Sequence, residues 1–352
     1  MRKFAIVGCG RISKRHSELL GLGQIENAAL AAVCDIDESK AKALGEKFDV
    51  PYYTDMDLMM QHEDIDVCTV LTPSGMHAEH TIRLAKYGKD IVVEKPMALT
   101  LDDADAMIRA CDQHNCRLFV IKQNRFNVPV VKMREALDAD KFGQLVLGTV
   151  RVRWARHQAY YDQDSWRGTW AMDGGVLTNQ ASHHLDLLQW CMGEVESVFA
   201  KSTTALANIE AEDTAVVTLK FKNGALGLIE ATSATRPVDL EGSISVLGSK
   251  GSVVIGGFAV NEMTTWKFED ELDSEADVLN EFSVNPPNVY GFGHQAYYEH
   301  VMDCIENGGQ NLVDGLEGRK SLELINAIYE SVETGKEVFL RFTPQKCKLG
   351  QR

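Results

Sequence analysis

The sequence lacks the marks of several protein classes. No apolar run approaches the roughly 18 residues of a membrane helix, and the N-terminus leads directly into a strand pattern, so we expect no membrane span and no signal peptide. The eight cysteines form no CxxC pair, so we expect reduced thiols in a cytoplasmic protein without a metal. The net charge of −15 argues against a nucleic-acid partner.

A glycine turn between a strand and a helix opens the chain, whose 352 residues suit two globular domains. Phe4–Val7 is predicted to be a buried strand, Gly8-Cys9-Gly10 follows, and apolar residues at helical spacing begin at Ile12. Gly8 permits the tight turn, and Gly10 lets the backbone approach a pyrophosphate at the helix N-terminus. Because Ser13 replaces the third glycine of a dinucleotide fingerprint, the turn alone also fits an ordinary α/β unit.

The next strand supplies the acidic residue that a dinucleotide site needs. Leu30–Cys34 is apolar and ends in Asp35, whose carboxylate can accept hydrogen bonds from both hydroxyls of an adenine ribose. The same carboxylate would repel a 2′-phosphate. The sequence therefore predicts NAD, and not NADP, as the cofactor.

Strands and helices alternate up to residue 121. The predicted strand 66–70 leads into the segment 72–77, and the predicted strand 90–93 leads into Glu94-Lys95-Pro96. Because ligands bind beside the carboxyl ends of parallel strands, both segments are predicted to lie at the cofactor site, although 72–77 suits a helix cap equally well. The other predicted elements of this half are helices at 37–48, 54–61 and 101–113, the last capped by Thr100, and a strand at 117–122.

The second half is predicted to be rich in strands. They are expected at 145–156, 195–204, 214–221, 225–234, 242–247 and 252–256, with helices at 129–137, 290–307 and 316–333 and a solvated acidic loop at 269–281. Asn223-Gly224 is a strong hairpin signal. The predicted fold is α/β: an N-terminal Rossmann dinucleotide-binding domain, residues 1–121, and a C-terminal α+β domain, residues 122–352, with a large, mostly antiparallel open sheet.

A histidine on a predicted helix is the candidate proton acceptor. Gly174–Cys191 is predicted to be helical, so that Asn179 and His183 share one face and Asp186 lies within reach of the imidazole. An imidazole held by a carboxylate can accept a proton near neutral pH. The alternatives are a structural histidine and a zinc site that includes His184, but adjacent residues of a helix point in different directions.

Several of these features together resemble the Gfo/Idh/MocA oxidoreductases. They are the glycine turn, Asp35, the segment 72–77, Glu94-Lys95-Pro96 and the spacing Gly174-Gly175-x3-Asn179-x3-His183. The likeness runs from the first strand to the last helix. Within that family the chain is most similar to the WlbA-type UDP-N-acetylglucosaminuronate 3-dehydrogenases, in the segments 122–125, 160–161, 166–170, 179–183 and 210–214.

This resemblance implies oxidation of a sugar 3-hydroxyl to a ketone by NAD⁺. The reaction would precede a transamination that makes a diamino-sugar for a surface polysaccharide such as lipopolysaccharide. The resemblance also implies a homo-oligomer, a dimer or tetramer, built through the open sheet of the second domain. Many members of the family have Asp where this chain has Asn179, and a neutral amide can orient the sugar but cannot take up a proton.

The chemistry requires that the hydroxyl proton of a secondary alcohol leave together with the hydride. We expect His183 to take that proton while Lys95 hydrogen-bonds the same oxygen, with Lys95 as the alternative base. The predicted cofactor contacts are Gly8, Gly10, Arg11, Ile12, Asp35, Thr72, Ser74, His77, Glu94, Lys95, Gln123, Trp166 and Arg167. The predicted substrate contacts are Lys95, Asn124, Arg125, Arg156, Tyr160, Tyr161, Asn179 and His183.

Arginines and aromatic residues suggest the substrate class. A UDP-uronate is anionic, and a protein with a net charge of −15 can bind it only through local cations, for which arginine suits phosphate and carboxylate best. The sequence offers Arg125, Arg151, Arg153, Arg156 and Arg167, interspersed with Tyr160, Tyr161 and Trp166. For Arg151 and Arg153 a solvated strand face is the alternative. Other hypotheses are UDP-N-acetylglucosamine as substrate, a polyol such as inositol, and a non-catalytic ligand sensor of the same fold.

Overall fold

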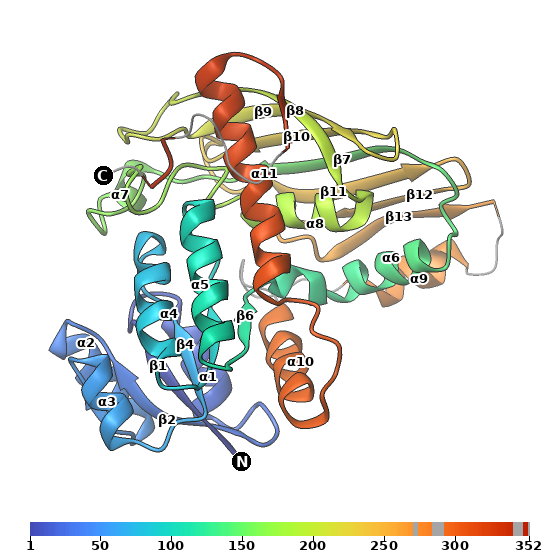
Figure 1. Cartoon of the computed structure of the whole chain (residues 1–352). Coiled ribbons are helices and arrows are strands. Elements are labelled where there is room, and N and C mark those ends of the chain that lie inside the picture. The colour runs from blue at the N-terminus through green and yellow to red at the C-terminus, as the bar shows by residue number, and fades with distance from the viewer. Residues whose placement is uncertain (270–273, 284–291, 341–347, 351–352) are drawn as a thin grey trace. The chain divides into compact units, whose positions relative to one another are not determined.

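The computed structural model describes residues 1–269, 274–283, 292–340 and 348–350, which divide into two compact units (Figure 1). The first unit comprises Met1–Ile121 and His294–Arg319, and the second comprises Lys122–Gly293 and Lys320–Arg352. The sequence predicts residues 294–319 in the second domain, whereas in the structure they belong to the first unit. Within the described residues no helix is long and apolar enough to cross a membrane, and the seven cysteines are free thiols.

The first unit is a doubly wound Rossmann fold, as the sequence predicts. Its six strands are parallel in the order β3-β2-β1-β4-β5-β6. The strands are β1 (Arg2–Val7), β2 (Ala28–Cys34), β3 (Tyr52–Tyr53), β4 (Val67–Val70), β5 (Asp90–Val93) and β6 (Leu118–Val120). The helices are α1 (Ser13–Gly21), α2 (Glu38–Phe48), α3 (Met56–His62), η1 (Ser74–Met76), α4 (His77–Ala85), α5 (Leu101–Gln113) and α10 (Gly293–Asn307). The strand order reverses between β1 and β4, and ligands bind at such a switch point.

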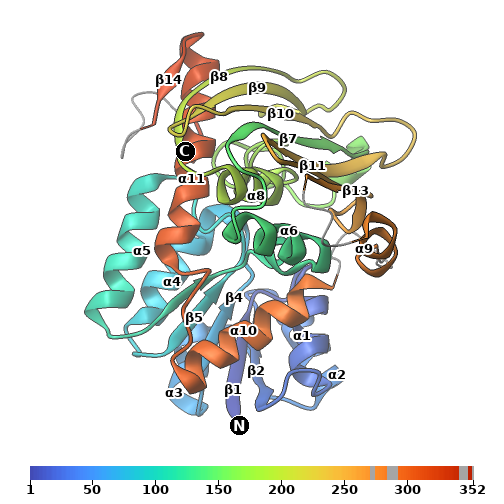
Figure 2. The same ribbon diagram turned by 90° about the vertical axis from the view of Figure 1, so that its right-hand side faces the viewer.

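Helices cover both faces of this sheet because its central strands are buried on both sides. In Figures 1 and 2, α4 and α5 run side by side over one face and α10 crosses the other. The ring of Tyr298 on α10 packs edge-on against Phe4 on β1, with ring centroids 5.8 Å apart. Thr100 caps α5 as predicted, since its side chain accepts a hydrogen bond from the backbone N–H of Asp103.

The second unit contains an eight-stranded sheet in the order β13-β12-β11-β7-β10-β9-β8-β14. Only β7 and β10 pair in parallel, so the expected mostly antiparallel sheet is confirmed. The strands are β7 (Leu145–Arg153), β8 (Val195–Thr203), β9 (Thr214–Phe221), β10 (Leu226–Thr232), β11 (Glu241–Gly248), β12 (Gly251–Gly256), β13 (Glu262–Phe268) and β14 (Val338–Phe339). The remaining elements are η2 (Gln123–Phe126), α6 (Val128–Asp138), α7 (Gln158–Tyr161), α8 (Ser182–Met192), α9 (Glu275–Glu281) and α11 (Gly315–Thr334), which begins in the first unit.

One face of this sheet packs against helices, with α8 on β7 and β11 and α6 on β12. Val150 and Val152 of β7 are fully buried, whereas Arg151 between them is exposed. Val146, near the start of β7, is 53% exposed. The alternation therefore holds only where α8 covers the strand.

Two expectations for the second unit were wrong. The acidic segment 269–281 was predicted to be a solvated loop, but Glu275–Glu281 forms α9, in which Val278 is buried. Residues 270–273 of that segment, and Tyr290, where a helix was predicted to begin, lie outside the described residues. The helix expected from Gly174 begins only at Ser182, because residues 171–181 form a series of turns.

Candidate active site

The glycine turn of the first unit leaves room for a ligand. Gly8 has a φ of +100°, and a Cβ at this position would lie 2.7 Å from the backbone carbonyl of Leu71, so only glycine fits. Around Gly10 no atom lies within 4 Å of such a Cβ, and the residue is exposed. Arg11, which is exposed, and Ile12 follow at the N-terminus of α1. This open turn fits a dinucleotide pyrophosphate.

Asp35 is held in place at the end of β2. Its Oδ2 accepts a hydrogen bond of 2.7 Å from the backbone N–H of Cys9, and its Oδ1 accepts one of 2.8 Å from Asp37. The carboxylate is thereby fixed beside the glycine turn, where an adenine ribose is expected. Ile36, the next residue, is 90% exposed and offers an apolar surface to an adenine ring. Sequence reasoning missed Ile36, although a large apolar residue directly after the acidic one was visible.

The segment 72–77 connects two loops of the first unit. His77 Nε2 lies 2.8 Å from the carbonyl oxygen of Thr72, and His77 Nδ1 lies 2.8 Å from that of Pro96. His80 Nδ1 contacts Thr72 Oγ1 at 3.0 Å. Ser74 is buried, and α4 begins without a side-chain cap, so the capping alternative is not what the structure shows. Since each ring nitrogen of His77 lies 2.8 Å from a backbone carbonyl oxygen, the imidazole bridges the loops that follow β4 and β5.

Lys95 follows β5 directly and is partly exposed. The peptide bond between Lys95 and Pro96 is cis. The preceding residue, Glu94, is buried, and its Oε2 accepts a hydrogen bond of 2.8 Å from the backbone N–H of Lys95. Lys95 thus lies at the carboxyl edge of the Rossmann sheet, where ligands bind.

In the second unit, His183 has a partner that the sequence did not suggest. The side-chain amide of Gln123 in η2 lies 2.8 Å from His183 Nε2. Asp186, expected to orient His183, binds two cations: its Oδ1 lies 3.0 Å from Lys122 Nζ, and Arg125 donates two hydrogen bonds of 2.8 Å to its carboxylate. All of these side chains are buried, as is Asn124 in η2. These charge and amide contacts anchor helix α8 to η2.

Asn179 lies in the turn before α8 and not on the helix. Its side-chain N–H donates to Asp173 Oδ1 over 2.5 Å, and Asp173 Oδ2 accepts a hydrogen bond of 2.8 Å from the backbone N–H of Gly168. Asp173 is buried, so this acceptor orients the amide of Asn179 firmly. Asn179 and His183 therefore do not share one helix face as predicted, because Asn179 lies in a turn that Asp173 fixes.

The Gly174-Gly175 pair is explained by a buried carboxyl group. A Cβ on Gly175 would collide with the backbone oxygen and the carboxyl group of Glu212. Glu212 Oε1 accepts hydrogen bonds from the backbone N–H of Leu177, at 2.9 Å, and from the hydroxyl of Tyr329, at 3.0 Å. Burial raises the pKa of Glu212 to about 7, against the opposing effect of these hydrogen bonds. Glu212 thus supports the turn that carries Asn179.

This raised pKa predicts a pH-dependent effect of Glu212→Gln. As pH rises from about 4.5 to 7, the unfolded chain loses the Glu212 proton while the folded chain keeps it, so the wild type loses stability. Glutamine has no such proton. Between pH 5 and pH 8 the free energy of unfolding of Glu212→Gln, relative to that of wild type, should increase by on the order of 2 kcal/mol. Denaturant unfolding at both pH values measures this difference. Glu210→Gln, on the exposed surface, is the matched control; an equal difference at both pH values would contradict the prediction.

The predicted basic and aromatic residues form a stack that pairs each arginine with a carboxylate. The guanidinium of Arg156 lies 5.2 Å from the ring centroid of Trp154 and 5.6 Å from that of Tyr160. Arg167 lies 4.6 Å from Tyr160 and 4.7 Å from Trp166. Asp239 binds Arg156 at 3.0 Å, and Asp164 binds Arg167 at 3.0 Å. The stack holds both guanidinium groups in fixed positions.

Three other residues of this set have structural partners. Tyr161 is buried, its hydroxyl lies 2.9 Å from Ser233 Oγ, and burial raises its pKa to about 12, so it belongs to the core. Arg151 and Arg153 pair with Glu230 and Glu241 on the sheet surface. The structure therefore shows these two arginines on a solvated strand face, which was the alternative to ligand binding.

Comparison with known proteins assigns the fold and its cofactor. Residues 2–122 match the Gfo/Idh/MocA oxidoreductase family, NAD-binding Rossmann fold, and residues 134–340 match the C-terminal alpha/beta domain of the same family. The chain belongs to the Gfo/Idh/MocA oxidoreductases. It is an NAD-dependent dehydrogenase, as the glycine turn and Asp35 predict.

Relatives within the Gfo/Idh/MocA family differ in substrate. The chain is 42% identical to the WlbA dehydrogenase from Bordetella pertussis, solved with NADH and UDP-GlcNAcA, with a TM-score of 0.91 over 97% of this chain and 98% of that one. The WlbA dehydrogenase from Chromobacterium violaceum, solved with the same ligands, is 41% identical, with a TM-score of 0.90 over 97% and 96%. Myo-inositol 2-dehydrogenase from Thermotoga maritima is 29% identical over 96% of this chain and 98% of its own.

Cofactor choice in this Gfo/Idh/MocA enzyme should depend on Asp35. Wild type is expected to show a higher kcat/KM with NAD⁺ than with NADP⁺, because the fixed carboxylate binds the ribose hydroxyls and repels a 2′-phosphate. Asp35→Ser should narrow that preference in steady-state kinetics with both cofactors. If wild type used NADP⁺ as efficiently as NAD⁺, Asp35 would not be the determinant.

Proposed function

We propose that the protein oxidises the 3-hydroxyl of UDP-N-acetylglucosaminuronate with NAD⁺. The observation that supports this most is the 42% identity, over 97% of this chain, to a dehydrogenase whose structure contains NADH and UDP-GlcNAcA. The main alternative is a polyol such as inositol, because the Thermotoga maritima relative acts on myo-inositol, at 29% identity. UDP-N-acetylglucosamine is the other sugar nucleotide to be distinguished.

The proposal gives each catalytic residue one task. NAD⁺, when bound, supplies the acceptor for the hydride. His183 takes the hydroxyl proton, for which a neutral imidazole is suited near pH 7. Lys95 donates a hydrogen bond to the same oxygen and stabilises its negative charge. Asn179, oriented by Asp173, fixes the sugar through its amide.

Recognition of the anionic substrate is assigned to the stacked arginines. Arg156 and Arg167 flank the ring of Tyr160, and a planar guanidinium held in this way suits phosphate or carboxylate. Each has a carboxylate partner, so a ligand would have to share or exchange that contact. Arg125 binds Asp186 with two hydrogen bonds and is buried, so its proposed part is to hold α8 in place.

The substrate proposal predicts discrimination by charge. The kcat/KM for UDP-N-acetylglucosaminuronate should exceed that for UDP-N-acetylglucosamine by about 10-fold or more, the effect of one charge-assisted hydrogen bond. The test is NADH formation at 340 nm with both sugar nucleotides and with myo-inositol as the control for the polyol alternative. Equal efficiency with the neutral sugar nucleotide, or with inositol, would refute the uronate assignment.

We also propose where the activity belongs and how the chain assembles. A 3-keto sugar nucleotide is a substrate for transamination, so the product would feed synthesis of a diamino-sugar for surface polysaccharide in the cytoplasm. The homo-oligomer, a dimer or tetramer, would form through the exposed face of the eight-stranded sheet. Large apolar side chains on three neighbouring strands support this: Phe199 on β8, Val216 on β9 and Leu226 on β10 are 39–56% exposed.

A further inference from the structure

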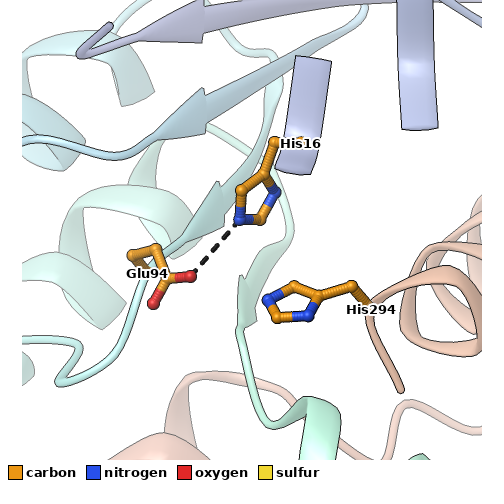
Figure 3. Close-up of side chains that lie close together, drawn as sticks. All are labelled: His16, Glu94 and His294. Atoms are coloured by element: carbon orange, nitrogen blue, oxygen red, sulfur yellow. Dashed lines mark hydrogen bonds and ion pairs between the residues drawn. The ribbon is translucent and has the colours of Figure 1, made fainter. Parts of the chain in front are cut away.

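Three buried ionisable side chains meet within the first unit, directly before Lys95. Figure 3 shows His16 from α1, Glu94 from the end of β5 and His294 from α10 pointing toward one another. One nitrogen or oxygen from each lies within 4.8 Å of the other two. His16 and His294 are 0% exposed and Glu94 is 6% exposed. Neither histidine was predicted from the sequence to take part in the site.

The contacts run in a chain that ends at Lys95. His16 Nδ1 lies 2.7 Å from the hydroxyl of Tyr298, and His16 Nε2 lies 3.3 Å from Glu94 Oε1. The other oxygen of Glu94 accepts the backbone N–H of Lys95 over 2.8 Å. The ring of His294 packs edge-on against His16, with centroids 5.3 Å apart. Both oxygens of Glu94 are therefore engaged.

The charge of this cluster is set by Glu94. Burial by itself raises the pKa of a carboxyl group, but the hydrogen bond and charge of His16, followed by the charges of Lys95 and His294, lower the pKa of Glu94 to about 2. Glu94 is therefore a carboxylate throughout the pH range of an enzyme assay. A buried carboxylate is costly unless polar or charged groups lie beside it. Here these groups are His16, Lys95 and His294, whose interactions lower the pKa of Glu94.

We propose that His16 and His294 are positioning residues that hold Glu94 as the buried counter-charge of Lys95. Lys95 then acts as an ammonium hydrogen-bond donor to the substrate oxygen, and the base is His183. This inference rests on the proposed function, in which Lys95 acts at that oxygen. It adds the buried groups that would keep Lys95 in its ammonium form, namely Glu94 and the two histidines that hold it.

Other ionisable groups near Glu94 do not provide this charge. His77 on α4 and the two tyrosines of α10, Tyr297 and Tyr298, all interact with Glu94 electrostatically. Burial lowers the pKa of His77 and raises the pKa of both tyrosines, so each favours its neutral form. The side chains that lower the pKa of Glu94 are thus those of His16, Lys95 and His294.

Two histidines and a glutamate are also a donor set that zinc accepts. In this structure His16 Nε2 and Glu94 Oε1 already contact each other, and Tyr298 binds the remaining nitrogen of His16. A proton shared between imidazole and carboxylate accounts for these contacts without an ion. Metal content is nevertheless part of the test, because a bound metal would replace that proton.

The test is Glu94→Gln, which keeps the shape and an oxygen acceptor but removes the charge. We expect kcat to fall about 10- to 100-fold, the size of a charge-assisted effect, while the Kd for NAD changes less than about threefold. We also expect the alkaline limb of the kcat–pH profile to move down by about one pH unit, since Lys95 loses its counter-charge. Ser17→Ala, next to His16 on α1, is the matched control and should leave kcat and the profile unchanged.

His16→Gln provides a second variant and should shift the same limb in the same direction by a smaller amount. If Glu94→Gln does not fold and His16→Gln does, the pH profile of His16→Gln is the test. A reduced kcat with an unmoved alkaline limb in these variants would overturn the inference, because that result fits a purely structural role. A stoichiometric metal in the purified protein, lost in His294→Gln, would overturn it as well. Failure of the proposed function is distinct, since wild type would then form no NADH with UDP-N-acetylglucosaminuronate, or Lys95→Met would retain turnover.

Discussion

Lys95→Met is expected to lower turnover by roughly 10²- to 10⁴-fold while NAD binding changes little. Methionine fills a similar volume but cannot donate a hydrogen bond, so the negative charge that develops on the substrate oxygen loses its stabilisation. The residue is partly exposed and follows β5 directly. Single-turnover kinetics at 340 nm, with NAD binding measured by fluorescence, separate the two effects.

Lys89→Met is the control for the lysine substitution, because Lys89 lies just before the other end of β5. It should leave turnover near the wild-type value. Turnover of Lys95→Met within about threefold of wild type would show that another group stabilises the oxygen.

His183→Ala is expected to cause a loss of comparable size, roughly 10²- to 10⁴-fold in kcat, because no proton acceptor remains at its position. Gln123 should keep its place in η2, since backbone contacts of that turn do not involve His183. The loss should diminish as pH rises, because hydroxide in solvent then accepts the proton more readily. The measurement is the kcat–pH profile of both proteins with saturating NAD⁺.

The neighbouring histidine offers a matched control. His184 is fully buried, packs edge-on against Trp154, and burial lowers its pKa to about 3. His184→Leu should therefore reduce stability and leave kcat close to wild type in the protein that folds. If His183→Ala retained nearly full turnover at pH 7, Lys95 would become the first alternative as base.

The Rossmann unit was predictable because its signals are local. The strand Phe4–Val7, the glycine turn and Asp35 lie within 35 residues of one another, and each has a direct counterpart in backbone geometry. The cap of α5 by Thr100 follows from the same kind of short-range pattern. Segments such as these specify their own conformation before any distant contact forms.

The partners of the candidate catalytic residues were not predictable in this way. Gln123 is 60 positions from His183, and the Lys122 and Arg125 contacts to Asp186 span similar distances in sequence, so a spacing of three residues on a helix could not indicate these partners. The start of α8 at Ser182 depends on the buried acceptors Asp173 and Glu212, which fix the preceding turns. Such long-range contacts leave no periodic trace in one sequence.

The return of residues 294–319 to the first unit has a consequence for how the protein is made. The backbone N–H of Val120 in β6 donates a hydrogen bond to the carbonyl oxygen of Val313 in this segment, and the ring of Tyr298 packs against Phe4. Ribosomes synthesise chains from the N-terminus, and most domains fold as soon as they emerge. The segment that packs against Phe4 and β6 is made only after more than four-fifths of the chain, so we expect the first unit to complete its packing late in synthesis.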